Sequence, residues 1–131
     1  MDSGAFFALL VAEDGHHVRA LEHFRAAHDA RWRLVTTNAV VYETHGLLVG
    51  RARAGRDLGL RFLEMLIGDA YRVERASPAD EARAEFVLRR HSDKDYSLCD
   101  ALSFVVMERL RIVEAIAFDR HFREYGKFTV L

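Results

Sequence analysis

The sequence has little cysteine, little lysine and no long apolar run, and each scarcity excludes a class of protein. Its single cysteine, Cys99, rules out an internal disulfide and a zinc site built from cysteines. One free cysteine also fits a reducing compartment, so we expect a cytoplasmic protein. No apolar stretch reaches the roughly 20 residues that a membrane span needs. No basic segment precedes the apolar residues 5–11, so we expect no signal peptide and no membrane association.

The charge balance does not point to nucleic-acid binding by itself. Nineteen Lys and Arg residues oppose 20 Asp and Glu residues, which gives a net charge of −1. Contact with a polyanion would therefore need a local basic patch. One candidate patch consists of Arg51, Arg53, Arg56 and Arg61, although a solvated helix face is the favoured interpretation of such a cluster.

Helical and strand patterns alternate along the chain, whose 131 residues we assign to a single domain, 1–131. Helices are predicted at residues 5–11, 16–31, 38–53, 58–66, 77–91, 98–110 and 120–125. Strands are predicted at residues 34–37, 71–76, 112–118 and 128–131, and residues 112–118 have the composition of a fully buried strand. This alternation predicts an α/β fold in three α/β/α layers, with a central parallel sheet of four to five strands.

The N-terminus begins where a first strand would normally end. The opening Asp2-Ser3-Gly4 is typical of a turn or a helix cap, and a strand usually precedes such a segment. We therefore expect the first strand to be truncated and the native chain to begin upstream of Met1.

Asp100 is an acid one turn into an almost wholly apolar helix. A carboxylate buried there costs several kcal/mol unless something pairs with it. Ser97-x-x-Asp100 reads as a capping box, with Asp in place of the usual Glu. The local sequence leaves both interpretations open, a capping residue or a functional acid.

Three further acids are predicted to lie at the same sheet edge as Asp100. Asp119 directly follows a predicted strand, Glu43 lies in the helix after another, and Asp2 would follow the missing first strand. Functional groups of parallel sheets gather beyond the carboxyl ends of the strands. Several carboxylates at one place need cations, and oxygen ligands without His or Cys select Mg²⁺ or Mn²⁺.

Four segments in this order resemble the motifs of PIN-domain ribonucleases, and most of all the VapC-type toxins of toxin–antitoxin pairs. The segments are Asp2 to Leu9, Thr37-Asn38 with Glu43, Asp95 to Phe104, and Ala117 to Phe122. The resemblance implies a Mg²⁺- or Mn²⁺-dependent endoribonuclease that cuts RNA by attack of water on a phosphodiester. It also implies a cognate antitoxin and a homodimer.

The resemblance also assigns roles to single residues. It implies that Asp2, Glu43, Asp100 and Asp119 are the catalytic metal ligands. Ser3, Asn38 and Asp95 are expected to support this metal site without binding the metal themselves. For the dimer, we expect an apolar surface formed by Leu47, Leu48, Leu58 and Phe62.

Two alternatives from other functional classes remain. The first is a PIN-like RNA-binding or RNA-processing module without a toxin role. The second is a carboxylate and Mg²⁺ domain for phosphoryl transfer, although the only two lysines, Lys94 and Lys127, offer no obvious partner for an acyl phosphate. The seven histidines show no metal-binding spacing, and His121 is interpreted as a surface or helix-capping residue rather than a catalytic one.

Overall fold

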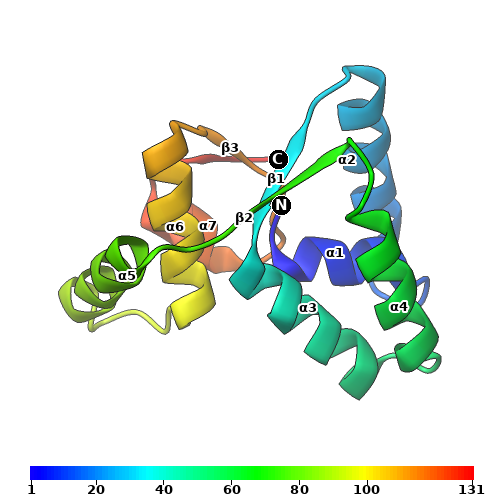
Figure 1. Cartoon of the computed structure of the whole chain (residues 1–131), viewed down its shortest axis with the longest axis horizontal. Helices are drawn as coiled ribbons and strands as arrows, with labels where there is room; N and C mark the ends of the chain where they lie inside the picture. Colours follow the sequence, from blue (N-terminus) through cyan, green and yellow to red (C-terminus); the bar gives the residue numbers. More distant parts are fainter.

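The computed structural model describes all 131 residues and alternates helices with short strands, as predicted (Figure 1). The helices are α1 (Ser3–Leu10), α2 (His17–Asp29), α3 (Asn38–Arg51), α4 (Gly55–Met65), α5 (Pro78–Arg90), α6 (Leu98–Leu110) and α7 (Arg120–Tyr125). The strands are β1 (Leu34–Thr37), β2 (Tyr71–Glu74), β3 (Glu114–Ala115) and β4 (Thr129–Val130). The bounds of β1 and α6 coincide with the predicted ones, and the order of elements is confirmed.

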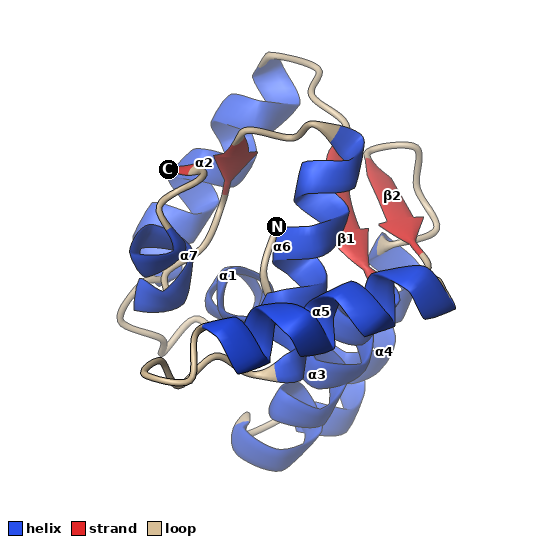
Figure 2. Ribbon diagram, turned by 90° about the vertical axis from the view of Figure 1, so that its left-hand side faces the viewer, coloured by secondary structure: helices blue, strands red, loops and turns tan.

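The strands lie between two groups of helices, α1 to α4 on one side and α5 to α7 on the other (Figures 1 and 2). Both strand pairs are parallel, which confirms the predicted α/β class. They form two separate ladders, β1 with β2 and β3 with β4. The expected continuous sheet of four to five strands is therefore divided into two halves.

Met1 and Asp2 fill part of the space between the two ladders and bond to both. The Met1 amine donates to the Val35 carbonyl at 2.8 Å, and the Asp2 amide donates to the Ile116 carbonyl at 3.1 Å. The predicted strand 112–118 is observed only as the two residues of β3. It is short because β4 is the only strand that pairs with it, and β4 also has two residues.

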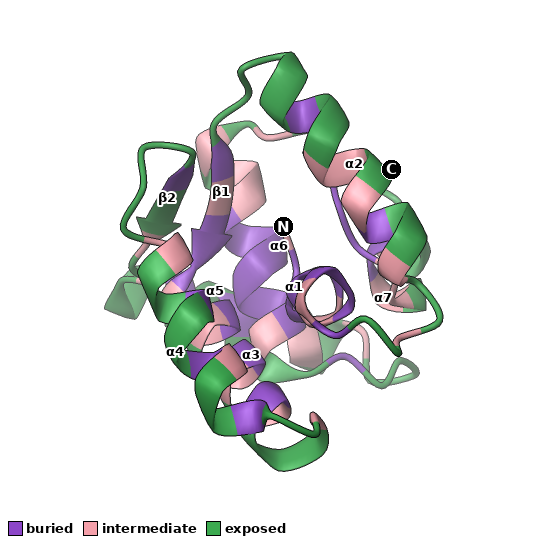
Figure 3. Cartoon of the chain, turned by 90° about the vertical axis from the view of Figure 1, so that its right-hand side faces the viewer, coloured by how far each residue is buried: buried purple, intermediate pink, exposed green.

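Helix α6 runs through the middle of the molecule, and its residues 100–106 are all buried (Figure 3). The main core packs α1, α3 and α4 against β1 and β2, with Phe6, Leu48 and Phe62 fully buried in it. The expected apolar dimer surface was therefore wrong for Leu48 and Phe62, which are core residues. The exposed apolar residues of this region are Leu60 and Leu63 of α4 and Ile67 just after it. No helix has the length and apolar character that crossing a membrane would require.

Candidate metal centre

Asp100 is held by the predicted capping box at the start of α6. The Ser97 amide and hydroxyl donate to its Oδ2 at 2.8 and 2.9 Å, while the Asp100 amide donates to Ser97 Oγ at 3.0 Å. The capping interpretation is thus correct for Oδ2. It does not account for the whole side chain, because Oδ1 of this buried carboxylate accepts no hydrogen bond.

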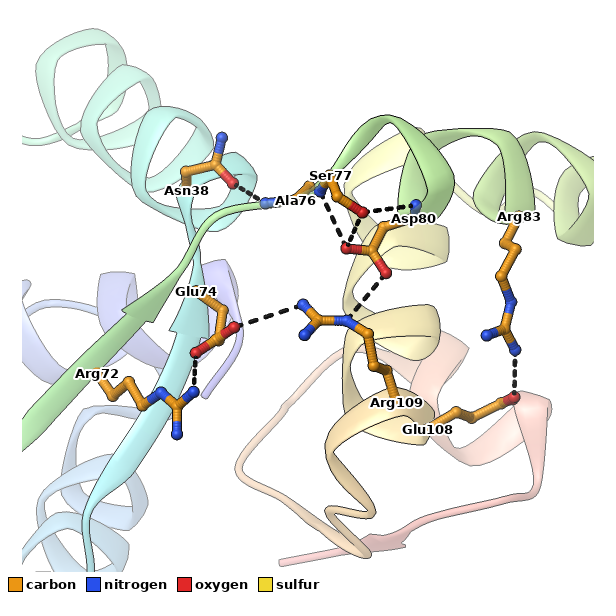
Figure 4. Close-up of polar contacts among 9 residues, drawn as sticks. All are labelled: Asn38, Arg72, Glu74, Ala76, Ser77, Asp80, Arg83, Glu108 and Arg109. Carbon is orange, nitrogen blue, oxygen red and sulfur yellow. Dashed lines mark hydrogen bonds and ion pairs between the residues drawn. The ribbon is translucent and has the colours of Figure 1, made fainter.

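Asp80 provides an internal comparison, because it occupies the same position of a second capping box at the start of α5 (Figure 4). Ser77 donates to its Oδ2, as Ser97 does in α6. The other oxygen, Oδ1, accepts a hydrogen bond from Arg109 Nε at 3.0 Å. Burial alone would raise the pKa of Asp80, but the bonds from Ser77 and Arg109 outweigh it and hold that pKa below its usual value. Asp100 has no such arginine.

His121 joins Asp100 to Asp119. Its Nδ1 lies 2.9 Å from Asp100 Oδ2 and 3.2 Å from Asp119 Oδ1. Asp119 caps α7 by accepting the His121 amide hydrogen at 2.6 Å. Two acceptors beside one ring nitrogen require Nδ1 to carry a hydrogen. The interpretation of His121 as a surface residue was therefore wrong, because its side chain is only 14% exposed and lies between two of the predicted ligands.

Asp100 and Glu43 lie close enough to Asp2 for their charges to interact with it. Burial raises the pKa of Asp2 to about 6, and the carboxylates of Asp100 and Glu43 act in the same direction. Burial also raises the pKa of the Cys99 thiol well above its usual range, followed by the effect of Glu43 beside it. These four acids come from four different elements or their caps and form the group that we call the acid cluster: Asp2, Glu43, Asp100 and Asp119.

The three supporting residues behave differently from one another. Ser3 is buried next to Asp2 at the start of α1. The side chain of Asn38 instead accepts the Ala76 amide hydrogen at 2.8 Å and so ties α3 to the segment after β2 (Figure 4). Asp95 has a side chain that is 87% exposed and pairs with Arg120 at 3.3 Å. Neither Asn38 nor Asp95 contacts the acid cluster.

The donor chemistry of the acid cluster suits a hard divalent cation, although its side chains are not arranged around one. No lysine or arginine forms an ion pair with any of the four acids. The basic groups beside them are the imidazole of His121, next to Asp100 and Asp119, and the N-terminal amine of Met1, whose charge lowers the pKa of Asp2. Oxygen donors of this kind are the ligands of Mg²⁺ and Mn²⁺. No three of the His, Cys, Asp and Glu side chains are placed to coordinate one ion together, so binding would require side-chain rotation.

The chain matches known proteins over almost its whole length. The PIN domain family model matches residues 1–128. The 23S rRNA-specific endonuclease VapC20 of Mycobacterium tuberculosis H37Rv is 34% identical over 93 residues, which cover 71% of this chain and 70% of VapC20. Ribonuclease VapC26 of the same strain is 28% identical over 137 aligned residues, which cover 100% of this chain and 98% of VapC26.

A solved structure agrees with these sequence relatives. The crystal structure of M. tuberculosis VapC20, described as a sarcin–ricin loop cleaving toxin, superposes with a TM-score of 0.85 at 30% identity. The superposition covers 98% of this chain and 95% of the VapC20 chain. The resemblance to VapC-type PIN-domain ribonucleases is confirmed, and the chain belongs to the PIN-domain family.

Proposed function

We propose that this protein is a divalent-metal-dependent endoribonuclease, with the acid cluster as its metal site. The observation that carries the proposal is a group of four carboxylates without an arginine or lysine partner, of which Asp2 and Asp100 are buried. A buried carboxylate that no arginine or lysine neutralises is costly and is a candidate for a functional group. The ribonuclease names of VapC20 and VapC26 support the same activity.

Each residue of the site has a distinct task in this proposal. Asp2, Glu43, Asp100 and Asp119 would hold the metal, which when bound lowers the pKa of water and neutralises charge on the transferring phosphate. The capping box fixes the Asp100 side chain, so that Oδ1 stays free of hydrogen bonds. His121 keeps Asp100 and Asp119 together, because its Nδ1 lies within hydrogen-bond distance of both carboxylates.

Replacing Asp100 and Asp80 one at a time tests the proposal with a matched control. Asp100→Asn retains an oxygen for the capping box and should lower RNA cleavage by at least about 100-fold, since loss of even a supporting residue costs 10–100-fold. Asp80→Asn changes the equivalent residue of the other box and should cleave RNA normally. It should also lose about 1–3 kcal/mol of stability through its weakened bond to Arg109.

The measurements are gel-based cleavage of RNA with Mg²⁺ or Mn²⁺ and calorimetric titration of Mn²⁺ into each variant. An Asp100→Asn protein that still binds Mn²⁺ and cleaves RNA as the unaltered protein does would remove Asp100 from the site. Loss of cleavage in both variants would mean that the experiment reports stability rather than chemistry.

We further propose that the protein acts as a toxin held inactive by a cognate antitoxin, and that it forms a homodimer. The description of VapC20 as a toxin supports the first part. Exposed Leu60 and Leu63 on α4, with Ile67 just after it, support an interface with another chain. Growth arrest on expression, relieved by co-expression of a protein that co-purifies with the chain from its own genomic context, tests the antitoxin. Light scattering tests the dimer, which a monomer at high concentration would exclude.

A further inference from the structure

A hollow of the surface lies between α5, α6 and the turn from α7 to β4. Its volume is about 590 Å³. We call it the α5 groove and define it by Arg83, Phe86, Arg90, His91, Tyr125 and Lys127. No sequence pattern predicts this groove, because its residues come from segments that are far apart along the chain.

The α5 groove is cationic. Three basic side chains line it against one acid, Glu108. Lys127 lies 2.8 Å and Arg83 3.7 Å from Glu108, so that acid is shared between them (Figure 4 shows the Arg83 contact). Arg90 forms no ion pair at all. The remaining acids of α5 do not line the groove, and one of them, Glu85, is bonded to Arg89 at 2.6 Å.

An aromatic side chain stands open to solvent among these cations. Phe86 is 63% exposed, one helical turn before Arg90 and almost one turn after Arg83. An exposed phenyl ring between the unpaired guanidinium group of Arg90 and that of Arg83, which shares Glu108 with Lys127, offers a stacking surface together with phosphate contacts. This combination favours a single-stranded nucleic acid over a protein, whose apolar surface would not use the excess positive charge.

One end of the α5 groove is near the acid cluster. The ring of His91, at that end, lies 5.8 Å from the ring of the buried Tyr96. The Tyr96 ring lies edge-on at 5.4 Å from that of His121, and His121 Nδ1 lies 2.9 Å from Asp100 Oδ2. Two ring contacts through the interior therefore separate this end of the groove from the proposed metal site.

We propose that the α5 groove binds the sugar–phosphate backbone and one base of single-stranded substrate RNA next to the bond that is cut. This inference rests on the proposed ribonuclease function and names where its substrate lies. Arg83 and Arg90 contact phosphates, and Phe86 stacks on a base.

The salt dependence of RNA binding tests the α5 groove, with EDTA present to prevent cleavage. The probe is a fluorescein-labelled oligouridylate, and its anisotropy gives Kd at several salt concentrations. Each phosphate contact to a single strand contributes about 0.7 to the slope of log Kd against log salt. The variant Arg83→Gln/Arg90→Gln should therefore lower that slope by about 1.4, and Phe86→Ala should weaken binding several-fold with an unchanged slope.

The matched control is Arg51→Gln/Arg53→Gln, which removes two charges from the rival basic cluster at the end of α3. It should leave the slope unchanged. An unaltered slope in Arg83→Gln/Arg90→Gln, or an equal loss in the control, overturns the proposal. So does a change of oligomeric state in Phe86→Ala without a change in RNA affinity, because the groove is then a protein interface.

Cleavage assays separate this inference from the proposed function. Normal cleavage with an unchanged salt slope would reject the α5 groove alone. RNA binding that depends on Arg83 and Arg90, without cleavage at any metal concentration, would support RNA binding in the α5 groove. The same result would reject the proposed ribonuclease function.

Discussion

Asp80 and Asp100 occupy the same position in the same motif, yet only Asp80 has an arginine against its second oxygen. The serine three residues earlier satisfies Oδ2 in both boxes. What remains at Oδ1 decides whether the acid is structural or available to a ligand. A local sequence motif cannot make this distinction, because Arg109 lies 29 residues from the acid that it neutralises.

Asp2 should make stability depend on pH in a direction opposite to that of a typical salt-bridged acid. Its pKa is about 6 in the folded protein, against 3.8 for an unperturbed carboxyl group. The folded state thus holds a proton that the unfolded state has lost between these values. The resulting stability is fully present below pH 3.8 and is lost as pH rises through 6, by an amount on the order of 3 kcal/mol.

The variant Asp2→Asn isolates this contribution, because it cannot ionise. In EDTA it should be more stable than the unaltered protein at pH 7.5, and the difference should disappear toward pH 4. Urea unfolding at a series of pH values gives both free energies. If the free energy of unfolding depends on pH in the same way in both proteins, burial does not raise the pKa of Asp2.

At the scale of elements, two glycines of the α3–α4 hairpin look alike in sequence and differ in their surroundings. A Cβ on Gly55 would lie 2.2 Å from the Leu48 carbonyl oxygen, whereas one on Gly46 would meet nothing within 4 Å. The close crossing of α3 and α4 therefore depends on Gly55. Since α3 also carries Glu43, this crossing helps to set where one acid of the cluster lies.

We predict that Gly55→Ala destabilises the protein by about 3 kcal/mol, because backbone atoms must move to admit the methyl group. The control Gly46→Ala should stabilise it by about 0.5–1 kcal/mol, since alanine favours the helix and the methyl group meets no neighbour. Urea unfolding at one pH measures both. Equal changes in the free energy of unfolding would mean that α3 and α4 can move apart at Gly55 without loss of stability.

At the scale of the whole molecule, the acid cluster joins segments that are far apart along the chain. Met1 and Asp2 connect the two ladders by hydrogen bonds to Val35 and Ile116, and Asp119 belongs to the segment that follows β3. A cation shared by Asp2, Asp100 and Asp119 would therefore link both halves and relieve the repulsion among their charges. Binding to the folded state alone stabilises it by mass action.

Saturating Mn²⁺ should accordingly raise the thermal midpoint. Stabilisation is about 2.7 kcal/mol when the free ion is about 100-fold above its Kd, which corresponds to a rise of several degrees. Differential scanning fluorimetry with and without EDTA measures the shift. Asp100→Asn should not show this rise in thermal midpoint. Asp80→Asn should show the full rise, although its midpoint without metal is lower. The same rise in all three proteins would mean that Mn²⁺ binds outside the acid cluster.

The order of elements and the α/β class followed from the sequence alone, and the choice of the four acids as metal ligands was also made there. Hydrophobic periodicity and capping residues act over a few neighbours, so β1, α6 and the capping box of Ser97 and Asp100 could be located without coordinates. The resemblance to PIN-domain ribonucleases rested on the same short segments, and the matching family model confirms it.

Only the tertiary structure decided which charges meet. Arg109 pairs with Asp80, whereas Asp100 has no arginine partner. His121 lies between Asp100 and Asp119. Asn38 and Asp95 bond to groups outside the acid cluster. The sheet is also divided into two ladders, and Leu48 and Phe62 are buried in the core. Such pairings depend on how distant segments pack, and packing is fixed by the whole chain rather than by any local pattern.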